Sequence, residues 1–132
     1  MRCLMVDDNA SFLAASRAIL HGPELSVVGE AATAAEAIER AEELHPDLML
    51  LDIDLGDDSG IELAHMLAEK AGSEAPWMIL ISAHPEEDYA DIVEESPALG
   101  FIAKSDLSCG AIKALLLKHG AVSRDGNHRE FK

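Results

Sequence analysis

The chain has few cysteines, few basic residues and no long apolar run. Only 2 of its 132 residues are cysteines, and Cys3 and Cys109 lack the paired spacing of a zinc or redox site. No stretch approaches the roughly 20 apolar residues that a membrane-spanning helix needs. Asp7 and Asp8 come too early in the chain for the roughly 7 to 15 residue apolar core of a signal peptide. We therefore expect a cytoplasmic protein with reduced thiols and no membrane partner.

Acidic residues outnumber basic ones by 25 to 10, which gives a formal net charge of -15. This charge opposes attraction to nucleic acid and to anionic lipid, so we expect no direct nucleic-acid binding by this segment. The length suits one folded domain, and 48% hydrophobic with 27% charged residues is typical of a globular protein. We predict a domain over residues 1–120, followed over residues 121–132 by a polar tail that is disordered or begins a linker.

Five short apolar runs alternate with segments of helical periodicity. The predicted strands are 2–6, 25–29, 47–51, 76–81 and 99–103, and the predicted helices are 11–21, 33–45, 60–71, 85–96 and 107–119. Strands that are apolar along their whole length are typical of a parallel sheet with helices on both faces. We therefore predict an α/β fold with a doubly wound, five-stranded parallel sheet, in which residues 53–59 form a loop.

The same pattern predicts helix ends and helix faces. Thr33 and Glu36 have the spacing of a capping box, and Pro85 suits the first turn of an acidic helix. Apolar side chains that repeat on one face should pack against the sheet. The inward residues predicted in this way are Phe12, Ala15, Ile19 and Leu20 in the first helix, and Leu107, Ala111, Ala114, Leu115 and Leu117 in the last.

Polar side chains stand just past the carboxyl ends of four predicted strands. Asp7 and Asp8 follow the first strand, Asp52 follows the third, Ser82 the fourth and Lys104 the fifth. In a parallel α/β sheet, ligands bind in the crevice outside these strand ends. We therefore expect three carboxylates, one hydroxyl and one ammonium group to meet at one edge of the sheet.

The chemistry of that edge favours a bound cation. Two carboxylates 4 Å apart repel each other by roughly 4 kcal/mol at an effective dielectric constant near 20. A ligand set made only of oxygen atoms, with one or two direct carboxylates, suits magnesium. Asp8 and Asp52 are the expected direct ligands. A plainer alternative is that Asp7 and Asp8 only cap the first helix.

In this order, these residues resemble the receiver domain of two-component response regulators, over residues 2–119. The segment Val6–Asp8 is similar to the acidic pair of that family, Asp52 to its phosphoaccepting aspartate and Ser82 to its hydroxyl residue. Phe101 is similar to its switch aromatic, and Lys104 to its lysine. The intervals of 44, 30 and 22 positions that separate Asp8, Asp52, Ser82 and Lys104 also fit the family.

The resemblance implies the flavodoxin-like strand order 2-1-3-4-5 and a signalling role in place of enzymatic turnover. Asp52 would accept a phosphoryl group from a phosphohistidine of a sensor histidine kinase or of a histidine phosphotransfer protein. Asp7, mainly through water, and the backbone carbonyl of Asp54 would join the magnesium ligands. Lys104 would neutralise charge on the transferring group.

The resemblance also implies a switch. The Ser82 hydroxyl would move toward the phosphoryl group and Phe101 would rotate inward, which changes the face made by the fourth helix, fifth strand and fifth helix. A homodimer or an output partner would use that face. The segment 104–107 resembles the same segment in receivers that are joined to the DNA-binding domains of bacterial transcription regulators. His84 would tune hydrolysis of the acyl phosphate; a loop residue without a role is its alternative.

Two other functions stay open. The segment Leu51–Asp54 also resembles the start of haloacid-dehalogenase-type phosphatases, with Asp52 as nucleophile and Asp54 as acid, although Gly56 does not suit that motif. A receiver-like module that binds its partner without phosphorylation is the third possibility. Within the receiver family, Gly56 and Ser105 stand where proline is common.

Overall fold

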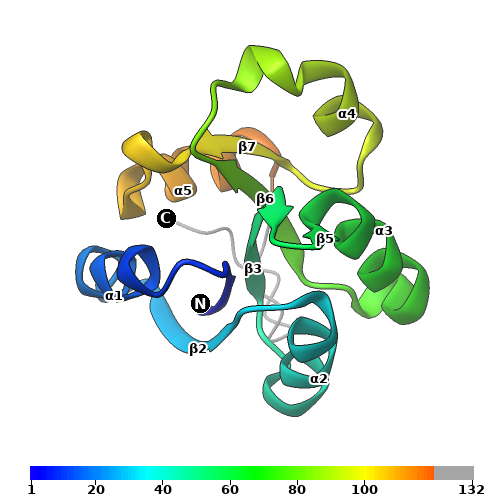
Figure 1. The fold of residues 1–132 in the computed structure, drawn as a ribbon. Helices are drawn as coiled ribbons and strands as arrows, with labels where there is room; N and C mark the ends of the chain where they lie inside the picture. The colour runs from blue at the N-terminus through cyan, green and yellow to red at the C-terminus, as the bar shows by residue number, and fades with distance from the viewer. Residues whose placement is uncertain (121–132) are drawn as a thin grey trace.

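A five-stranded parallel sheet runs through the computed structural model, which describes residues 1–120 (Figure 1). In order across the sheet, the strands are β2 (Ser26–Ala31), β1 (Arg2–Val6), β3 (Leu48–Asp52), β6 (Trp77–Ser82) and β7 (Gly100–Ala103). Because β6 and β7 are the predicted fourth and fifth strands, the expected order 2-1-3-4-5 is confirmed. The predicted polar tail over residues 121–132 lies outside the described residues.

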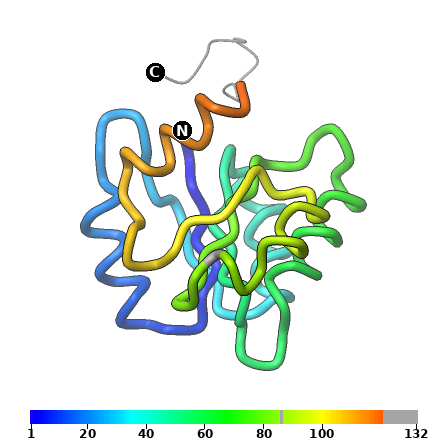
Figure 2. Tube along the Cα trace, turned by 90° about the horizontal axis from the view of Figure 1, so that it is seen from above, coloured from blue at the N-terminus to red at the C-terminus, as the bar shows by residue number. Residues whose placement is uncertain are grey.

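Helices cover both faces of the sheet (Figures 1 and 2). One face carries α1 (Ala10–Ile19) and α5 (Cys109–Lys118), and the other carries α2 (Ala34–Leu44), α3 (Gly60–Ala71) and α4 (Ala90–Glu95). In Figure 2 the blue α1 and orange α5 lie together on one side, and the cyan to green helices lie on the other. No helix of the described residues is long and apolar enough to cross a bilayer.

The two helix layers explain why the strands are apolar throughout. Side chains alternate between the faces of a strand, so Cys3 and Met5 pack in the cluster with α1 and α5. Leu4 and Val6 pack in the opposite cluster with α2, α3 and α4. Both faces of β1 are therefore buried, as a parallel sheet between two helix layers requires.

The connection after β3 differs from the loop predicted over residues 53–59. It contains a two-stranded antiparallel hairpin of β4 (Asp54–Leu55) and β5 (Asp58–Ser59). The turn between them includes Gly56 at φ 62°, a left-handed conformation that glycine adopts without steric cost. Proline, which is common at this position in the receiver family, cannot adopt this φ, so the turn excludes it and favours glycine.

Side-chain caps begin four of the helices, each within two residues of its predicted start. Thr33 accepts a hydrogen bond from the Glu36 N–H at 3.1 Å, and Glu36 in turn accepts the N–H of Ala32 at 2.8 Å. Ser59 and Ser108 cap α3 and α5 by accepting the N–H groups of Glu62 and Ala111. The N-cap of α1 is Asn9, so Asp7 and Asp8 do not hold that position.

The predicted inner faces of α1 and α5 were partly wrong. The buried residues of α1 and its C-cap are Leu13, Ser16 and Leu20, whereas Ile19 is 57% exposed. In α5, Ile112 and Leu116 are buried instead of the predicted Ala114 and Leu117. Both helices are apolar on several sides, so more than one face satisfies a helical period.

The predicted acidic helix over residues 85–96 is also shorter than expected. A 3₁₀ turn occupies Glu86–Asp88, and the regular α4 runs only over Ala90–Glu95. Acidic residues one helical turn apart, such as Asp91 and Glu95, repel each other, and repulsion of this kind weakens a helix. Two further 3₁₀ turns, Gly72–Glu74 and Lys104–Asp106, complete the described secondary structure.

Candidate functional site

The fold brings the predicted polar residues to one edge of the sheet. Asp7 directly follows β1, Asp52 ends β3, Ser82 ends β6 and Lys104 follows β7. The parallel register places the ends of β3, β6 and β7 side by side, with Asp52 opposite Ile81 and Ser82 opposite Ala103. Carboxylate oxygens of Asp7, Asp8 and Asp52 lie within 4.8 Å of one another, and we call these three residues the acidic cluster.

Burial differs across the acidic cluster. Asp7 is fully buried and Asp52 is 3% exposed, whereas Asp8 is exposed. Ser82 is fully buried beside them at the end of β6. Two of the three carboxylates therefore lie in a site from which most water is excluded, and Asp8 forms its solvent side.

Lys104 supplies a positive charge to this edge. Its Nζ atom lies 2.7 Å from Oδ2 of Asp7 and 3.2 Å from Oδ2 of Asp52. The lysine side chain is 17% exposed, so these contacts are weakly screened by solvent. One ammonium group against three carboxylates still leaves an excess of negative charge.

The excess of negative charge changes the pKa values of Asp52 and Lys104. Burial, together with the negative charge of Asp7, raises the pKa of the Asp52 carboxyl from 3.8 to about 6, although the Asp54 N–H and Lys104 oppose this rise. Burial lowers the pKa of Lys104, but the hydrogen bonds and charges of Asp7 and Asp52 outweigh it and raise that pKa. The site therefore stabilises a cation and penalises the Asp52 carboxylate.

Backbone N–H groups two residues downstream orient three of the polar side chains. Oδ1 of Asp7 accepts the Asn9 N–H at 2.8 Å, and Oδ1 of Asp52 accepts the Asp54 N–H at 3.1 Å. Oγ of Ser82 accepts the His84 N–H at 3.0 Å. In each case a sharp turn after the strand returns the chain to the preceding side chain. Because Oδ1 of Asp52 is oriented in this way, its Oδ2 faces Lys104.

The predicted switch residue Phe101 is part of an aromatic row. Phe101 is 9% exposed in β7, and its ring stacks on Tyr89 with centroids 6.1 Å apart and an interplanar angle of 30°. Tyr89 also lies 6.5 Å from the ring of His84. The row His84, Tyr89 and Phe101 thus links the loop after Ser82 to β7. Sequence reasoning missed Tyr89, because a lone tyrosine before an acidic helix has no distinctive spacing.

Two more residues at the site were missed as functional positions. Phe12 was predicted to be core, but the Nζ atom of Lys104 lies 4.4 Å from the centroid of its ring. Gly60 was predicted only as a helix start, yet it packs directly against the backbone of Asp52. Hydrophobic periodicity carries no signal for a contact between residues 92 positions apart. The glycine at the start of α3 was a usable hint, since glycine permits close approach of backbones.

The donors of the acidic cluster fit a hard divalent cation. They are all carboxylate oxygens, with an excess of negative charge that one lysine does not balance. Magnesium prefers such ligands and keeps several of its waters, which the exposed side at Asp8 allows. The backbone carbonyl of Asp54 remains a predicted ligand.

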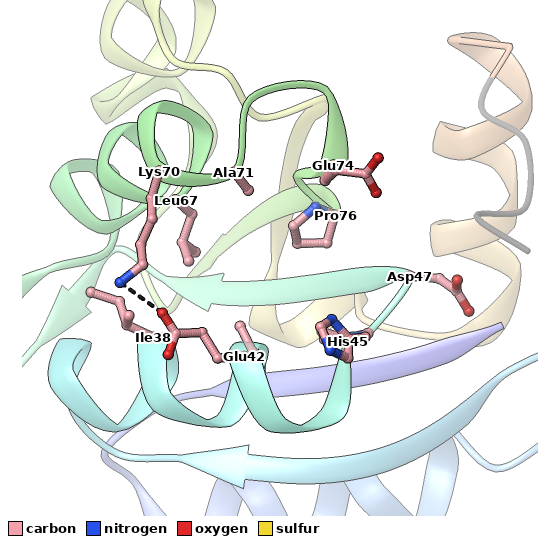
Figure 3. A pocket seen from close by; sticks show the side chains of 11 residues that line it. Ile38, Glu42, His45, Asp47, Leu67, Lys70, Ala71, Glu74 and Pro76 are labelled. Atoms are coloured by element: carbon pink, nitrogen blue, oxygen red, sulfur yellow. Dashed lines mark ion pairs between the residues drawn. The ribbon is translucent and has the colours of Figure 1, made fainter.

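A separate hollow lies far from the acidic cluster. It encloses about 440 Å³ between α2 and α3, where β3 and β6 begin (Figure 3). Glu42 of α2 and Lys70 of α3 form a 2.7 Å ion pair across it. None of the predicted site residues lines this hollow. The charged edge at the opposite end of the strands is therefore identified by its side chains and not by the volume of a cavity.

Residues 3–112 of the chain match the family described as response regulator receiver domain. Among curated proteins, the chain is 33% identical over 113 residues to the nitrate/nitrite response regulator protein NarL of Escherichia coli, covering 85% of this chain and 51% of that protein. It is 32% identical over 124 residues to a protein-glutamate methylesterase/protein-glutamine glutaminase of Thermotoga maritima, covering 93% and 32%. The chain thus spans between a third and about half of the length of these relatives.

Solved structures give the same result. A two-component response regulator of the LuxR family from an Aurantimonas species superposes with a TM-score of 0.78 at 29% identity, covering 94% of this chain and 90% of that one. The response regulator domain of CheB from Thermotoga maritima superposes with a TM-score of 0.71 at 28% identity, covering 90% and 92%. The predicted doubly wound fold and the predicted receiver resemblance are both confirmed.

Proposed function

The chain belongs to the response regulator receiver domain family, and from this premise we propose that Asp52 accepts a phosphoryl group from a phosphohistidine of a sensor histidine kinase or of a histidine phosphotransfer protein. One observation carries the proposal. The ammonium of Lys104 lies 3.2 Å from Oδ2 of Asp52, inside a cluster of three carboxylates at the carboxyl edge of the sheet. A nucleophilic oxygen, a charge-neutralising cation and a set of oxygen ligands for a metal are therefore adjacent.

In the proposed reaction, a carboxylate oxygen of Asp52 attacks phosphorus while the bond from phosphorus to the donor imidazole nitrogen breaks. The imidazole leaves with the bonding electrons, and Asp52 becomes an acyl phosphate. Lys104 neutralises charge on the phosphoryl oxygens, for which its present contact with Asp52 positions it. Asp8, Asp52 and the carbonyl of Asp54, with Asp7 acting mainly through water, would hold magnesium, which supplies further positive charge when bound.

The proposed signal starts at Ser82. Its oxygen accepts the His84 N–H, which leaves the hydroxyl hydrogen available to the phosphoryl group. Movement of Ser82 would change the turn that carries His84, and His84 contacts Tyr89, which stacks on Phe101. The proposed readout is a changed face of α4, β7 and α5. In this proposal His84 also tunes the lifetime of the acyl phosphate.

The proposed output face has a composition that restricts its partners. Helix α4 carries Asp91, Glu94 and Glu95 with an exposed Ile92, and α5 adds an exposed Leu117. Acidic residues around exposed apolar side chains favour a basic partner. A homodimer through this face must overcome repulsion between the two copies of α4. Similarity to the DNA-binding transcriptional activator EvgA of Escherichia coli, 26% identical over 106 residues, favours an output that controls transcription through a DNA-binding domain outside the described residues.

The test is phosphorylation by acetyl phosphate with Mg²⁺, followed by Phos-tag electrophoresis. The wild-type chain and the Asp57→Asn variant, which removes an exposed carboxylate five positions away, should both become phosphorylated. Asp52→Asn should not, and an Asp52→Asn protein that is phosphorylated to the wild-type extent would contradict the assignment. Sustained release of phosphate from a phosphomonoester would favour the phosphatase alternative. Partner affinity that ignores phosphorylation would favour a binding module.

A further inference from the structure

We propose that Phe12 is a positioning residue for phosphotransfer, whose aromatic face holds the ammonium of Lys104 beside Asp52. This inference rests on the proposed function and adds a residue to its site. The Nζ atom lies 4.4 Å from the centroid of the Phe12 ring, well inside the roughly 6 Å within which a cation is attracted to an aromatic face. The lysine side chain is only 17% exposed, and partial removal from water strengthens such a contact.

The backbone of Phe12 is tied to the site through two hydrogen bonds at the start of α1. Oδ1 of Asn9 accepts the Phe12 N–H at 3.0 Å, and the Asn9 N–H donates to Oδ1 of Asp7 at 2.8 Å. Oδ2 of Asp7 in turn lies 2.7 Å from Nζ of Lys104. These contacts form a ring that joins Asp7, Asn9, Phe12 and Lys104 and returns to Asp7. They fix the first turn of α1 relative to Lys104.

The role of the ring follows from what Lys104 must do during transfer. At rest, its ammonium is shared between Asp7 at 2.7 Å and Asp52 at 3.2 Å, so it lies nearer to the carboxylate that does not react. During transfer, its N–H groups must turn toward the phosphoryl oxygens. A ring attracts the charge without accepting a strong hydrogen bond, so it keeps the ammonium near Asp52 while leaving those N–H groups free.

Replacement of the ring by an aliphatic side chain should therefore slow phosphotransfer. Phe12→Leu keeps an apolar side chain at this position but loses the attraction of an aromatic face for the charge. Lys104 would then settle on Asp7, and the rate of phosphorylation by acetyl phosphate should fall about threefold to tenfold, as expected for the loss of one partly buried cation–π contact. Phe12→Tyr and Phe12→Trp keep an aromatic face and should restore most of the rate.

The decisive measurement is a series of fluorinated phenylalanines at position 12, introduced during translation. Each added fluorine withdraws electron density from the ring face with little change of shape. The logarithm of the phosphorylation rate, followed by Phos-tag electrophoresis at fixed Mg²⁺, should fall in step with the number of fluorines, while the melting temperature stays constant. A merely structural ring predicts a flat series. A flat series, or a Phe12→Leu variant as fast as wild type, overturns the proposal.

Two further measurements separate this inference from the proposed function. In a Lys104→Ala background, Phe12→Leu should cause no additional loss of rate, because the ring acts through the lysine. By NMR, the side-chain methylene protons next to Nζ of Lys104 should show an upfield ring-current shift that disappears in Phe12→Leu. Absence of that shift in the wild type overturns the Phe12 contact even if Asp52 is phosphorylated normally. A wild-type chain that acetyl phosphate never modifies overturns the proposed function, and the positioning role with it.

Discussion

Gly60 and Asp52 pack backbone to backbone, and a Cβ atom on Gly60 would collide with the carbonyl oxygen of Asp52. The Gly60 N–H also donates to the carbonyl of Ile53 at 3.0 Å. The start of α3 therefore packs against, and is hydrogen-bonded to, the end of β3 beside the candidate phosphoacceptor Asp52. No side chain fits between them, so the position of the Asp52 carboxylate depends on glycine at position 60.

Gly60→Ala should destabilise the fold and displace Asp52. The clash is with backbone atoms, which cannot turn aside as a flexible side chain can. We expect a loss of about 3 kcal/mol in the free energy of unfolding, at the upper end of overpacking costs. Urea unfolding followed by circular dichroism measures this loss. Phosphorylation by acetyl phosphate should slow in the same variant, because Asp52 moves relative to Lys104.

Gly110→Ala is the matched control for that substitution. Gly110 lies within α5, and its Cβ would meet only Oγ of Ser108 at 3.8 Å, which is ordinary contact. Alanine is favoured over glycine in a helix by up to about 1 kcal/mol, so this variant should be more stable than wild type. Equal losses in Gly60→Ala and Gly110→Ala would refute the steric argument.

Asp52→Asn should stabilise the protein in the absence of metal. Burial and the charge of Asp7 raise the pKa of Asp52 from 3.8 to about 6, so the folded state binds the proton more tightly than the unfolded chain. The stabilising contribution is present below about pH 4 and is lost as the pH rises through 6. The rise in the pKa of Asp52 from 3.8 to about 6 corresponds to about 3 kcal/mol at most, and exposure on the Asp8 side reduces the expected gain at pH 7 to about 1–2 kcal/mol.

The measurement is urea unfolding of wild type and Asp52→Asn with EDTA, at pH 4 and pH 7. The advantage of the variant should be present at pH 7 and small at pH 4. Millimolar Mg²⁺ should reduce the difference in stability between Asp52→Asn and wild type, because the folded wild-type protein gains the binding free energy of the ion. Asp57→Asn, at an exposed carboxylate, is the control and should show neither effect. If Asp52→Asn is no more stable than wild type at pH 7, the ionised Asp52 carboxylate does not destabilise the folded state.

The sheet and the edge that carries the site were predictable, because their causes are local. Strands such as Leu48–Asp52 are buried on both faces, so their sequence is apolar without alternation. Asp52 and Ser82 each end such a strand, so their polar side chains lie at the carboxyl edge of the sheet. The convergence of Asp52 and Lys104 then follows from the topology of any parallel sheet of this order.

The faces of α1 and α5 were not predictable in the same way. The segment Ala10–Ile19 has one charged residue, Arg17, so several choices of inner face satisfy the helical period. The exposure of Ile19, at 57%, follows from how α1 lies against α5 and the sheet, which is a tertiary property. The contact between Phe12 and Lys104 is of the same kind, since it depends on the end of β7 meeting the first turn of α1.

Tyr89 is the chain's one tyrosine and should report the switch. Its ring stacks on Phe101 at 6.1 Å and lies 6.5 Å from His84, so any rearrangement between Ser82 and β7 changes its surroundings. Addition of acetyl phosphate and Mg²⁺ should shift its ring resonances in the NMR spectrum. The same addition to Asp52→Asn should leave them in place. Unshifted resonances in a sample that Phos-tag shows to be fully phosphorylated would exclude the aromatic row from signalling.

Tyr89→Ala tests how much the aromatic row of His84, Tyr89 and Phe101 contributes to the stability of the fold. Loss of the stacked pair should expose Phe101 and lower the free energy of unfolding by about 1–2 kcal/mol. Tyr89→Phe keeps the stack and should remain within about 0.5 kcal/mol of wild type, since the hydroxyl has no part in the ring contact. Equal effects of the two substitutions would mean that the hydroxyl, not the stacked ring, stabilises this region.

Cys3 gives the fold a sensitivity to alkaline pH. Burial, with a smaller effect of Cys109, raises the pKa of the Cys3 thiol from 9.0 to about 12. The folded state keeps this proton while the unfolded chain loses it above about pH 9, so stability is unaffected below pH 9 and falls as the pH rises toward 12. The fall should approach about 1.4 kcal/mol per pH unit within that window.

Urea unfolding of wild type and Cys3→Val between pH 8 and pH 10.5 isolates this effect, because all other titrating groups are common to both proteins. The difference in stability should move in favour of the variant as the pH rises. At pH 8, a thiol reagent should modify the partly exposed Cys109 in the native protein and reach Cys3 only after unfolding. Parallel pH curves, or rapid modification of both thiols in the folded protein, would mean that β1 opens to solvent far more readily than its full burial implies.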